Sequence, residues 1–258
     1  LKYLRAYAGS LRLNAVTGKW VDEYREYLLS QPKLGKATAS KYLEALKSLL
    51  RIATKNLILP KNPAELVQNI KVPETLKPYL NEEELAKLYR TPIGGKLGAE
   101  IKVAFLFGYT SGLRKSDLTV LKWGDIVAGE RWQIRKVQKK TETIVMIPLN
   151  EDAKRLINVE SKASHDPLEL VFPRLSASKT NTNQYLKKWG IKAGVETKIG
   201  WHISRHTFGT LALEHGADPI TVQNLLGHKK IATTLIYAKS TDTTKRKAVD
   251  NLPSITLQ

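Results

Sequence analysis

A short segment without hydrophobic periodicity divides the chain. Residues 72–79 read VPETLKPY and include Pro73 and Pro78. Proline disfavours the helical conformation at the residue before it, so this segment is expected to be an extended linker. A chain of 258 residues is long enough to bury a separate core on each side. The sequence therefore predicts three parts: a domain over residues 1–72, a linker over residues 73–79 and a second domain over residues 80–258.

The first domain shows two amphipathic helical patterns. Apolar side chains recur every three or four residues over residues 17–29 and again over residues 38–53. Asn62 and Pro63 are expected to open a third, short helix, which makes the domain all-helical. Basic side chains form a row with a spacing of four residues: Lys47, Arg51 and Lys55. Such a row is either a solvated face or a phosphate-binding face.

The net charge supports the second interpretation of that row. Lys and Arg number 42 against 24 Asp and Glu, which leaves +18. Residues 1–77 hold 14 of the basic and 6 of the acidic side chains, so both domains are basic. This excess is larger than solubility requires and indicates a polyanionic partner, with double-stranded DNA as the natural candidate.

Other features of the composition exclude several classes of protein. The chain has no cysteine, which excludes disulfides and thiolate metal sites. No secretory pattern and no apolar run of about 18 residues is present, so a soluble cytoplasmic protein is expected. The first residue is Leu rather than Met, so we expect a piece of a longer chain.

The second domain is predicted to be mainly helical with a small β-hairpin sheet, an α+β fold. Residues 101–111 form a buried helical pattern that stops at Gly112. Residues 132–137 and 143–149 are rich in β-branched side chains around a polar turn, which predicts a hairpin. Further helices are expected after Asn81, over residues 152–157 and over residues 181–193.

Four side chains suited to a phosphate lie within residues 201–237. His202 and Arg205 are three positions apart in a helical pattern, so they project from adjacent turns of one face. A glycine and then an Asp-Pro pair end that helix and begin another. His228 comes directly after the second helix. Tyr237 comes nine residues later in an apolar run that is expected to bury its ring and leave its hydroxyl exposed.

A fifth candidate, Arg114, lies at a junction between two predicted helices. Such a junction can aim a guanidinium and backbone donors at one anion. Ser116 and Asp117 are expected to cap the next helix, through residues 120 and 121. Considered alone, Arg114 would be interpreted as a surface arginine.

These positions together resemble the tyrosine recombinases, a family that includes phage and conjugative-element integrases. The matching residues occur in order in short motifs: Arg114 in TSGLRKSDL, Lys140 in KKTETIVMIPL, His202 and Arg205 in HISRHTF, His228 in LLGH and Tyr237 in TTLIYAK. One HxxR motif would be unspecific, but six positions in order are specific. The helical N-terminal segment resembles the core-binding domain of the family, so the resemblance covers both domains. The separate arm-binding domain of many integrases has no counterpart in these residues.

The resemblance implies DNA strand exchange by transesterification. Tyr237 would attack a DNA phosphate, form a 3′-phosphotyrosyl link and release a 5′-hydroxyl, which later attacks the link on a partner strand. Because the protein–DNA ester conserves the bond energy, neither ATP nor another cofactor is needed. The resemblance also implies a homotetramer in synapsis, and excision factors or DNA-bending proteins are conceivable partners.

The chemistry of the matching residues suits those roles. Arg114 and Arg205 would clamp the phosphate, since a guanidinium offers forked donors to its oxygens. Lys140 would protonate the departing 5′-oxygen. Its neighbour Lys139 competes for that role and is otherwise a DNA contact, because a basic hairpin tip can enter a groove.

The histidines and Asp117 complete the predicted site. Tyrosine has an ordinary pKa of about 10 and needs help to lose its proton, for which His202 is the candidate. His228 would hydrogen-bond a non-bridging oxygen. Asp117 either orients the site from behind Arg114 or only caps a helix. His206 and His215 are interpreted as structural.

Two other functions and a metal site compete with this interpretation. Residues 208–226 also suit a helix-turn-helix of a non-catalytic DNA-binding regulator. A type IB-like topoisomerase would use the same chemistry on DNA. His202 and His206 have a zinc-binding spacing, but Arg205 between them would repel a cation, so no metal is expected.

Overall fold

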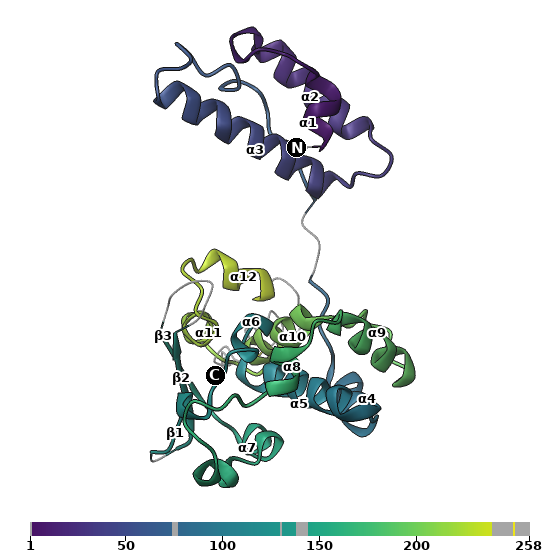
Figure 1. Ribbon diagram of the computed structural model, residues 1–258, viewed down its shortest axis with the longest axis vertical. Coiled ribbons are helices and arrows are strands. Elements are labelled where there is room, and N and C mark those ends of the chain that lie inside the picture. Colours follow the sequence, from purple (N-terminus) through teal and green to yellow (C-terminus); the bar gives the residue numbers. More distant parts are fainter. Residues whose placement is uncertain (1, 74–76, 130, 138–143, 239–249, 251–258) are drawn as a thin grey trace, which may run out of the picture. The chain divides into compact units, whose positions relative to one another are not determined.

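The computed structural model describes residues 2–73, 77–129, 131–137, 144–238 and 250. Contacts within the chain define two compact units, Leu1–Thr75 and Leu76–Gln258 (Figure 1). No helix in the described ranges is long and apolar enough to cross a membrane.

The first unit is helical. Its elements are α1 (Lys2–Ala8), η1 (Leu13–Ala15), α2 (Gly18–Ser30) and α3 (Lys36–Lys55). Helix α2 begins after Thr17, whose hydroxyl accepts a hydrogen bond from the Trp20 amide at 3.2 Å. Val21, Tyr24 and Leu28 from α2 pack on apolar side chains of α3 and form the core.

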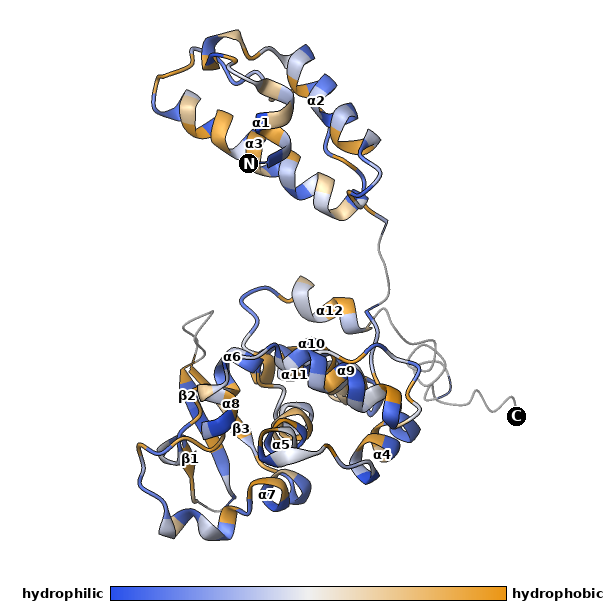
Figure 2. Cartoon of the chain, turned by 45° about the vertical axis from the view of Figure 1, so that its right-hand side comes forward, coloured by the Kyte–Doolittle hydropathy of each residue, from blue (hydrophilic) through white to orange (hydrophobic). Residues whose placement is uncertain are grey.

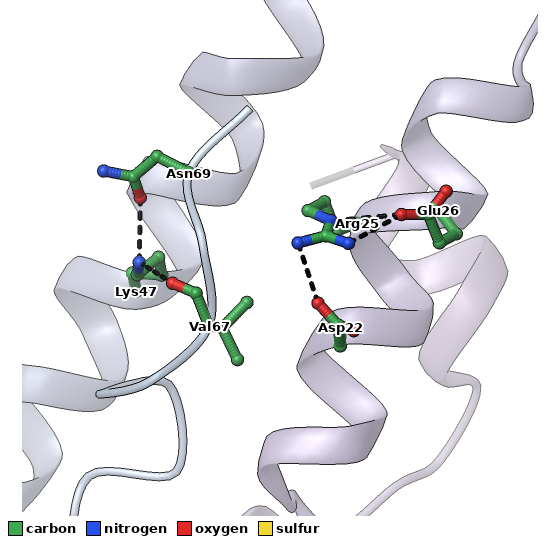
Figure 3. Close-up of polar contacts among 6 residues, drawn as sticks. All are labelled: Asp22, Arg25, Glu26, Lys47, Val67 and Asn69. Atoms are coloured by element: carbon green, nitrogen blue, oxygen red, sulfur yellow. Dashed lines mark hydrogen bonds and ion pairs between the residues drawn. The ribbon is translucent and has the colours of Figure 1, made fainter. Parts of the chain in front are cut away.

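The prediction of a helix from Asn62 is wrong. Residues 61–73 form turns and then an extended segment. The Asn62 side chain accepts a hydrogen bond from the Ala64 amide at 3.0 Å, which closes a turn in place of a helix. The extended part is tied to α3, because the Lys47 ammonium donates to the Val67 carbonyl at 2.6 Å and to Asn69 Oδ1 at 2.8 Å (Figure 3).

The second unit is mainly helical with one small antiparallel sheet, which confirms the predicted fold class. Its helices are α4 (Glu82–Arg90), α5 (Gly95–Ser111), α6 (Lys115–Leu118), α7 (Glu151–Ile157), α8 (Pro173–Ala177), α9 (Thr182–Lys192), α10 (Trp201–Glu214), α11 (Pro219–Leu226) and α12 (Ala232–Ala238), with 3-10 turns η2 (Trp123–Asp125) and η3 (Val159–Ser164). Its strands are β1 (Ile126–Val127), β2 (Gln133–Val137) and β3 (Ile144–Pro148), in the order β1-β2-β3.

Helix α5 forms the centre of this unit and contacts α7, α8, α9 and α10 (Figure 2). Phe105 and Phe107 are fully buried there, and the Phe105 ring meets the Trp189 ring edge-on at 5.6 Å. The helix ends at Gly112, which has a φ of 66°. A side chain at Gly112 would lie 2.8 Å from the Phe208 ring, so glycine allows both the turn and the close approach to α10.

The sheet extends the predicted hairpin by one short strand, β1. Strands β2 and β3 pair in register with Ile134 opposite Ile147 and Lys136 opposite Val145. Lys136 lies on the buried side and donates to Asp125 at 2.6 Å and to the Val120 carbonyl at 3.1 Å. These bonds join β2 to the segment after α6. The predicted turn that contains Lys139 and Lys140 lies outside the described residues.

Candidate active site

Helix α10 supplies two of the residues of the predicted phosphate site, His202 and Arg205. His202, Arg205 and His206 lie within its first two turns, and Gly209 lies one turn later. Arg205 is buried, His206 is half-buried and His202 is exposed. The charged and hydrogen-bonding side chains of α10 therefore extend from the protein interior at Arg205 to the surface at His202.

Arg205 is held by the ends of two other helices. Its guanidinium donates to the Gly112 carbonyl at 2.7 Å and to the Leu226 carbonyl at 2.6 Å, and the residue is only 4% exposed. Both carbonyls lie at helix C-terminal ends, which carry partial negative charge. Gly112 and Gly227 adopt the left-handed conformation that ends α5 and α11. The two glycine caps thus provide the support for a buried cation.

Burial and the nearby Arg114 charge lower the pKa of Arg205 to about 10. At neutral pH the guanidinium stays protonated. Asp117 is fully buried and acts on this pKa in the opposite direction. Arg114, Arg205 and Asp117 therefore form one electrostatic group with an excess of positive charge, as an anion site requires.

Arg114 occupies the position before α6, as the sequence predicted for a helix junction. The capping differs from the expectation, because α6 ends at Leu118 and Asp117 is its third residue. The Asp117 carboxylate accepts a hydrogen bond from the Arg114 backbone amide at 3.3 Å. The Asp117 carboxylate therefore stabilises the turn and raises the pKa of the buried arginine, and its orienting role in the site stays a prediction.

Tyr237 lies in α12 and is 3% exposed, so the expectation of an exposed hydroxyl is wrong. Its hydroxyl is 3.2 Å from His206 Nδ1. Desolvation by burial raises the pKa of Tyr237, while the Arg205 charge and hydrogen bond and the Arg114 charge lower it. The tyrosine is protonated at neutral pH and lies within the field of both arginines.

His206 is the site residue that the sequence interpretation missed. The sequence favours a structural role for it, yet it contacts the candidate nucleophile, whereas His202 lies on the exposed side with its ring centre 6.2 Å from that of His206. Burial, followed by the charges of His202, Lys77 and Arg205, lowers the pKa of His206 to about 4. The ring is therefore neutral at physiological pH.

His228 is fixed by its own loop and by α12. Its Nδ1 lies 2.8 Å from the hydroxyl of Thr234, which is fully buried, and its ring stacks on Tyr237 with centres 6.1 Å apart. Burial and the charges of Arg205 and Arg114 lower the pKa of His228 to about 4. A groove of about 400 Å³ between β3 and α11 reaches this histidine.

The other predicted contacts lie on α3 and on the hairpin. Lys47 is in the first unit with its ammonium bonded to its own chain, while Arg51 and Lys55 are exposed on the same helix. Their contact with DNA stays a prediction, as do the roles of Lys139 and Lys140. In the described part of the chain, no three His, Cys, Asp or Glu side chains form a cluster that could hold a metal.

The described site brings a buried tyrosine under the influence of Arg114 and Arg205 and places it beside His206 and His228, on a chain with a net charge of +18. The chain belongs to the phage integrase family: residues 78–244 match the model of that family, and residues 1–72 match the phage integrase SAM-like domain.

Individual relatives agree with this assignment. The tyrosine recombinase XerC of Chlamydia trachomatis serovar L2 is 31% identical over 229 residues, which cover 84% of this chain and 71% of the relative. The fold is similar to that of XerH site-specific recombinase bound to a palindromic difH substrate, with a TM-score of 0.75, 19% identity and coverage of 96% of this chain and 76% of the other. It is also similar to a lambda integrase dimer bound to a core site, with a TM-score of 0.72, 18% identity and coverage of 100% and 89%. The predicted family and enzyme class, a tyrosine site-specific recombinase that binds DNA, are confirmed.

Proposed function

We propose that this recombinase cuts and rejoins DNA through Tyr237, with the scissile phosphate bound by Arg114 and Arg205. One observation carries the assignment: the buried Tyr237 places its hydroxyl 3.2 Å from His206 Nδ1, and His206 directly follows the buried Arg205 on α10 of the same chain. Each chain would then cleave the strand bound at its own arginines. The domain assignment proposed with it is a core-binding domain over residues 1–72, a linker over 73–79 and a catalytic domain over 80–258.

The chemistry balances without an added reactant. The phenolic oxygen of Tyr237 forms a bond to phosphorus as the bond to the 5′-oxygen breaks, and the phenolic proton passes to a base, for which His202 is the candidate. Lys140 supplies a proton to the 5′-oxygen, which departs as a hydroxyl. Rejoining reverses the step, with a 5′-hydroxyl attacking phosphorus and the tyrosine leaving. The arginines stabilise the negative charge on the equatorial oxygens in both directions.

The two remaining predicted histidines have different surroundings and so different proposed roles. His228 is neutral, and its Nδ1 pairs with the Thr234 hydroxyl. When Thr234 donates this bond, the His228 proton resides on Nε2, which is then a donor for a non-bridging oxygen. His202 is exposed one turn from Arg205 and is the candidate that assists proton transfer once the phosphate is bound.

Double-stranded DNA is the substrate, and further contacts come from the basic residues of both units. Exposed Arg51 and Lys55 are proposed to bind phosphates, with Lys139 at the hairpin. Lys47 belongs to the same row, but its bonds to Val67 and Asn69 make it mainly a support for that surface. A homotetramer in synapsis, excision or DNA-bending partners, and action at the nucleoid of a bacterial or phage-infected cell complete the proposal.

A suicide-substrate assay tests this function. The protein is incubated with nicked duplexes from the ends of its native element in the presence of EDTA, the reaction is stopped with SDS, and covalent complexes are detected as an SDS-resistant band. We expect a band with the natural chain and none with Tyr237→Phe, which retains the ring and should still bind DNA. A covalent band in Tyr237→Phe would remove Tyr237 as the nucleophile.

A further inference from the structure

The Tyr237 side chain packs closely against helix α10. A side chain at Gly209 would have its Cβ 2.9 Å from the Tyr237 ring, so the absence of one lets the ring lie directly on the helix. His206 precedes Gly209 by one turn and has its Nδ1 3.2 Å from the hydroxyl. The two residues share one face of α10 because they are three positions apart. One contacts the ring and the other the reactive oxygen.

The direction of the hydrogen bond is set by the groups around the phenol. Arg205 lowers the pKa of Tyr237, and a guanidinium can interact with the phenolic oxygen only as a donor, so the phenolic proton is left for another acceptor. The neutral His206 ring can accept that proton at Nδ1 when its own proton is on Nε2. The bond is therefore O–H to Nδ1, with the tyrosine as donor.

We propose that His206 is a positioning residue that holds the Tyr237 hydroxyl against α10, beside Arg205, before the DNA phosphate binds. This inference rests on the proposed function, because it assigns the state from which Tyr237 attacks. The role is hydrogen bonding rather than proton removal: a ring with a pKa of about 4 is a poor base for a phenol whose pKa is raised by burial. A side chain that hydrogen-bonds the Tyr237 hydroxyl but does not titrate should therefore substitute for His206 with little loss of cleavage rate.

Substitutions of His206 test the role through the rate of covalent complex formation. The amide of asparagine lies near the position of Nδ1, so His206→Asn is expected to stay within about threefold of the natural rate, whereas His206→Ala should lose about tenfold to a hundredfold through misplacement of the nucleophile. His215→Ala is the matched control, since His215 is exposed at the end of the same helix. Equal rates for the alanine variant and the natural chain would overturn the proposal, as would an asparagine variant as slow as alanine.

A spectroscopic measurement tests the same bond without any DNA. In protein carrying ¹⁵N-labelled histidine, the His206 Nδ1 resonance, assigned through its loss in His206→Asn, should move when Tyr237 is replaced by Phe. An unchanged resonance would overturn the inference. If the natural chain formed no covalent complex on any DNA, the proposed function would fail, while this experiment would still decide whether the hydrogen bond exists.

Gly209→Ala provides a second, independent variant. The added methyl group would displace the Tyr237 ring, so we expect slower covalent complex formation and the same shift of the His206 Nδ1 resonance as in Tyr237→Phe. Thermal unfolding and DNA binding are measured in parallel to confirm a folded protein. A folded Gly209→Ala protein with the natural rate of covalent complex formation and an unchanged His206 Nδ1 resonance would show that packing of the ring on Gly209 does not position the nucleophile.

Discussion

The two units hold an arginine in opposite ways. In the first unit, Arg25 forms ion pairs with Asp22 at 2.9 Å and Glu26 at 2.8 Å on the surface of α2 (Figure 3). In the second unit, Arg205 is buried and its guanidinium is bound by two backbone carbonyls. Carboxylates neutralise the first cation, whereas carbonyl dipoles position the second without cancelling its charge.

This difference shows how a binding charge can be recognised in a basic protein. A carboxylate pair satisfies an arginine electrostatically, so Arg25 has little charge left for a phosphate. The two carbonyls satisfy only the hydrogen bonds of Arg205, and the neighbouring Arg114 adds a second positive charge to the site. Asp117 offsets part of this excess, and a bound phosphate would offset the rest.

The largest expected effect comes from removing the buried arginine. Arg205→Ala should reduce covalent complex formation by about 10²–10³-fold, because a positioned cation is lost from the transition state. It should also lower the free energy of unfolding by about 1–3 kcal/mol, since two buried carbonyls lose their donor. Suicide-substrate kinetics and chemical denaturation measure the two effects.

Arg25→Ala is the control for that experiment. Its carboxylate partners are exposed while the arginine is half-buried, so we expect a change in stability of at most about 1 kcal/mol and no change in the rate of cleavage. Natural cleavage by Arg205→Ala, or an equal loss in the two variants, would contradict the distinction between the two arginines.

Substitution of Thr234, which does not contact the DNA in our proposal, is expected to change the cleavage rate about tenfold. Thr234→Val keeps the shape of the side chain and removes the hydroxyl that lies 2.8 Å from His228 Nδ1. The imidazole then loses the bond that selects its tautomer, and the cleavage rate should fall about tenfold, equivalent to about 1.4 kcal/mol. Thr234→Ser retains the hydroxyl and should cleave at nearly the natural rate. A slow serine variant would point to packing rather than to the hydroxyl.

The residues that begin or end a helix through contacts within one turn can be predicted from the sequence. Helix α4 begins after Asn81, α5 ends at Gly112, and α11 begins at Asp218 and Pro219, all as predicted. The failure at Asn62 has the same local origin, because an Asn side chain that caps a helix can equally close a turn. Local chemistry thus specifies a change of chain direction, but it does not always specify whether the next segment is helical or extended.

The contacts that make the site specific come from distant parts of the chain. The carbonyls that bind Arg205 are 93 and 21 residues away from it, and the hydroxyl that meets His206 is 31 residues away. The spacing of His202 and Arg205 predicted that both lie on one helix, which is α10, but the same spacing could not select His206 as the contact of Tyr237. That choice depends on how α12 packs on α10, which no short motif encodes.

Effects on stability and on DNA binding should separate the members of the basic row on α3. Lys47→Met removes an ammonium that joins α3 to the segment around Val67, so we expect the first unit to lose about 1–3 kcal/mol of stability. Lys55→Ala, on an exposed position, should leave stability unchanged and reduce the salt dependence of DNA binding by about one phosphate contact. Hydrogen exchange of the first unit and binding titrations at several salt concentrations distinguish the two. A loss of stability in Lys55→Ala together with a reduced salt dependence and natural stability in Lys47→Met would contradict the supporting role of Lys47.

A pH dependence of stability is also expected to arise in the second unit. His206 and His228 both have pKa values lowered to about 4 by burial and neighbouring cations, whereas in the unfolded chain they protonate near their ordinary value of about 6.5. Between those values the unfolded state binds more protons, so the stabilising contribution is complete above pH 6.5 and is lost as the pH falls toward 4. Replacing both histidines by Asn should flatten the unfolding temperature over that window relative to His215→Asn, whose exposed ring serves as the control. Parallel curves for the two proteins would mean that the rings protonate as easily in the folded site as in water, and the neutral imidazoles inferred beside Tyr237 would have to be abandoned.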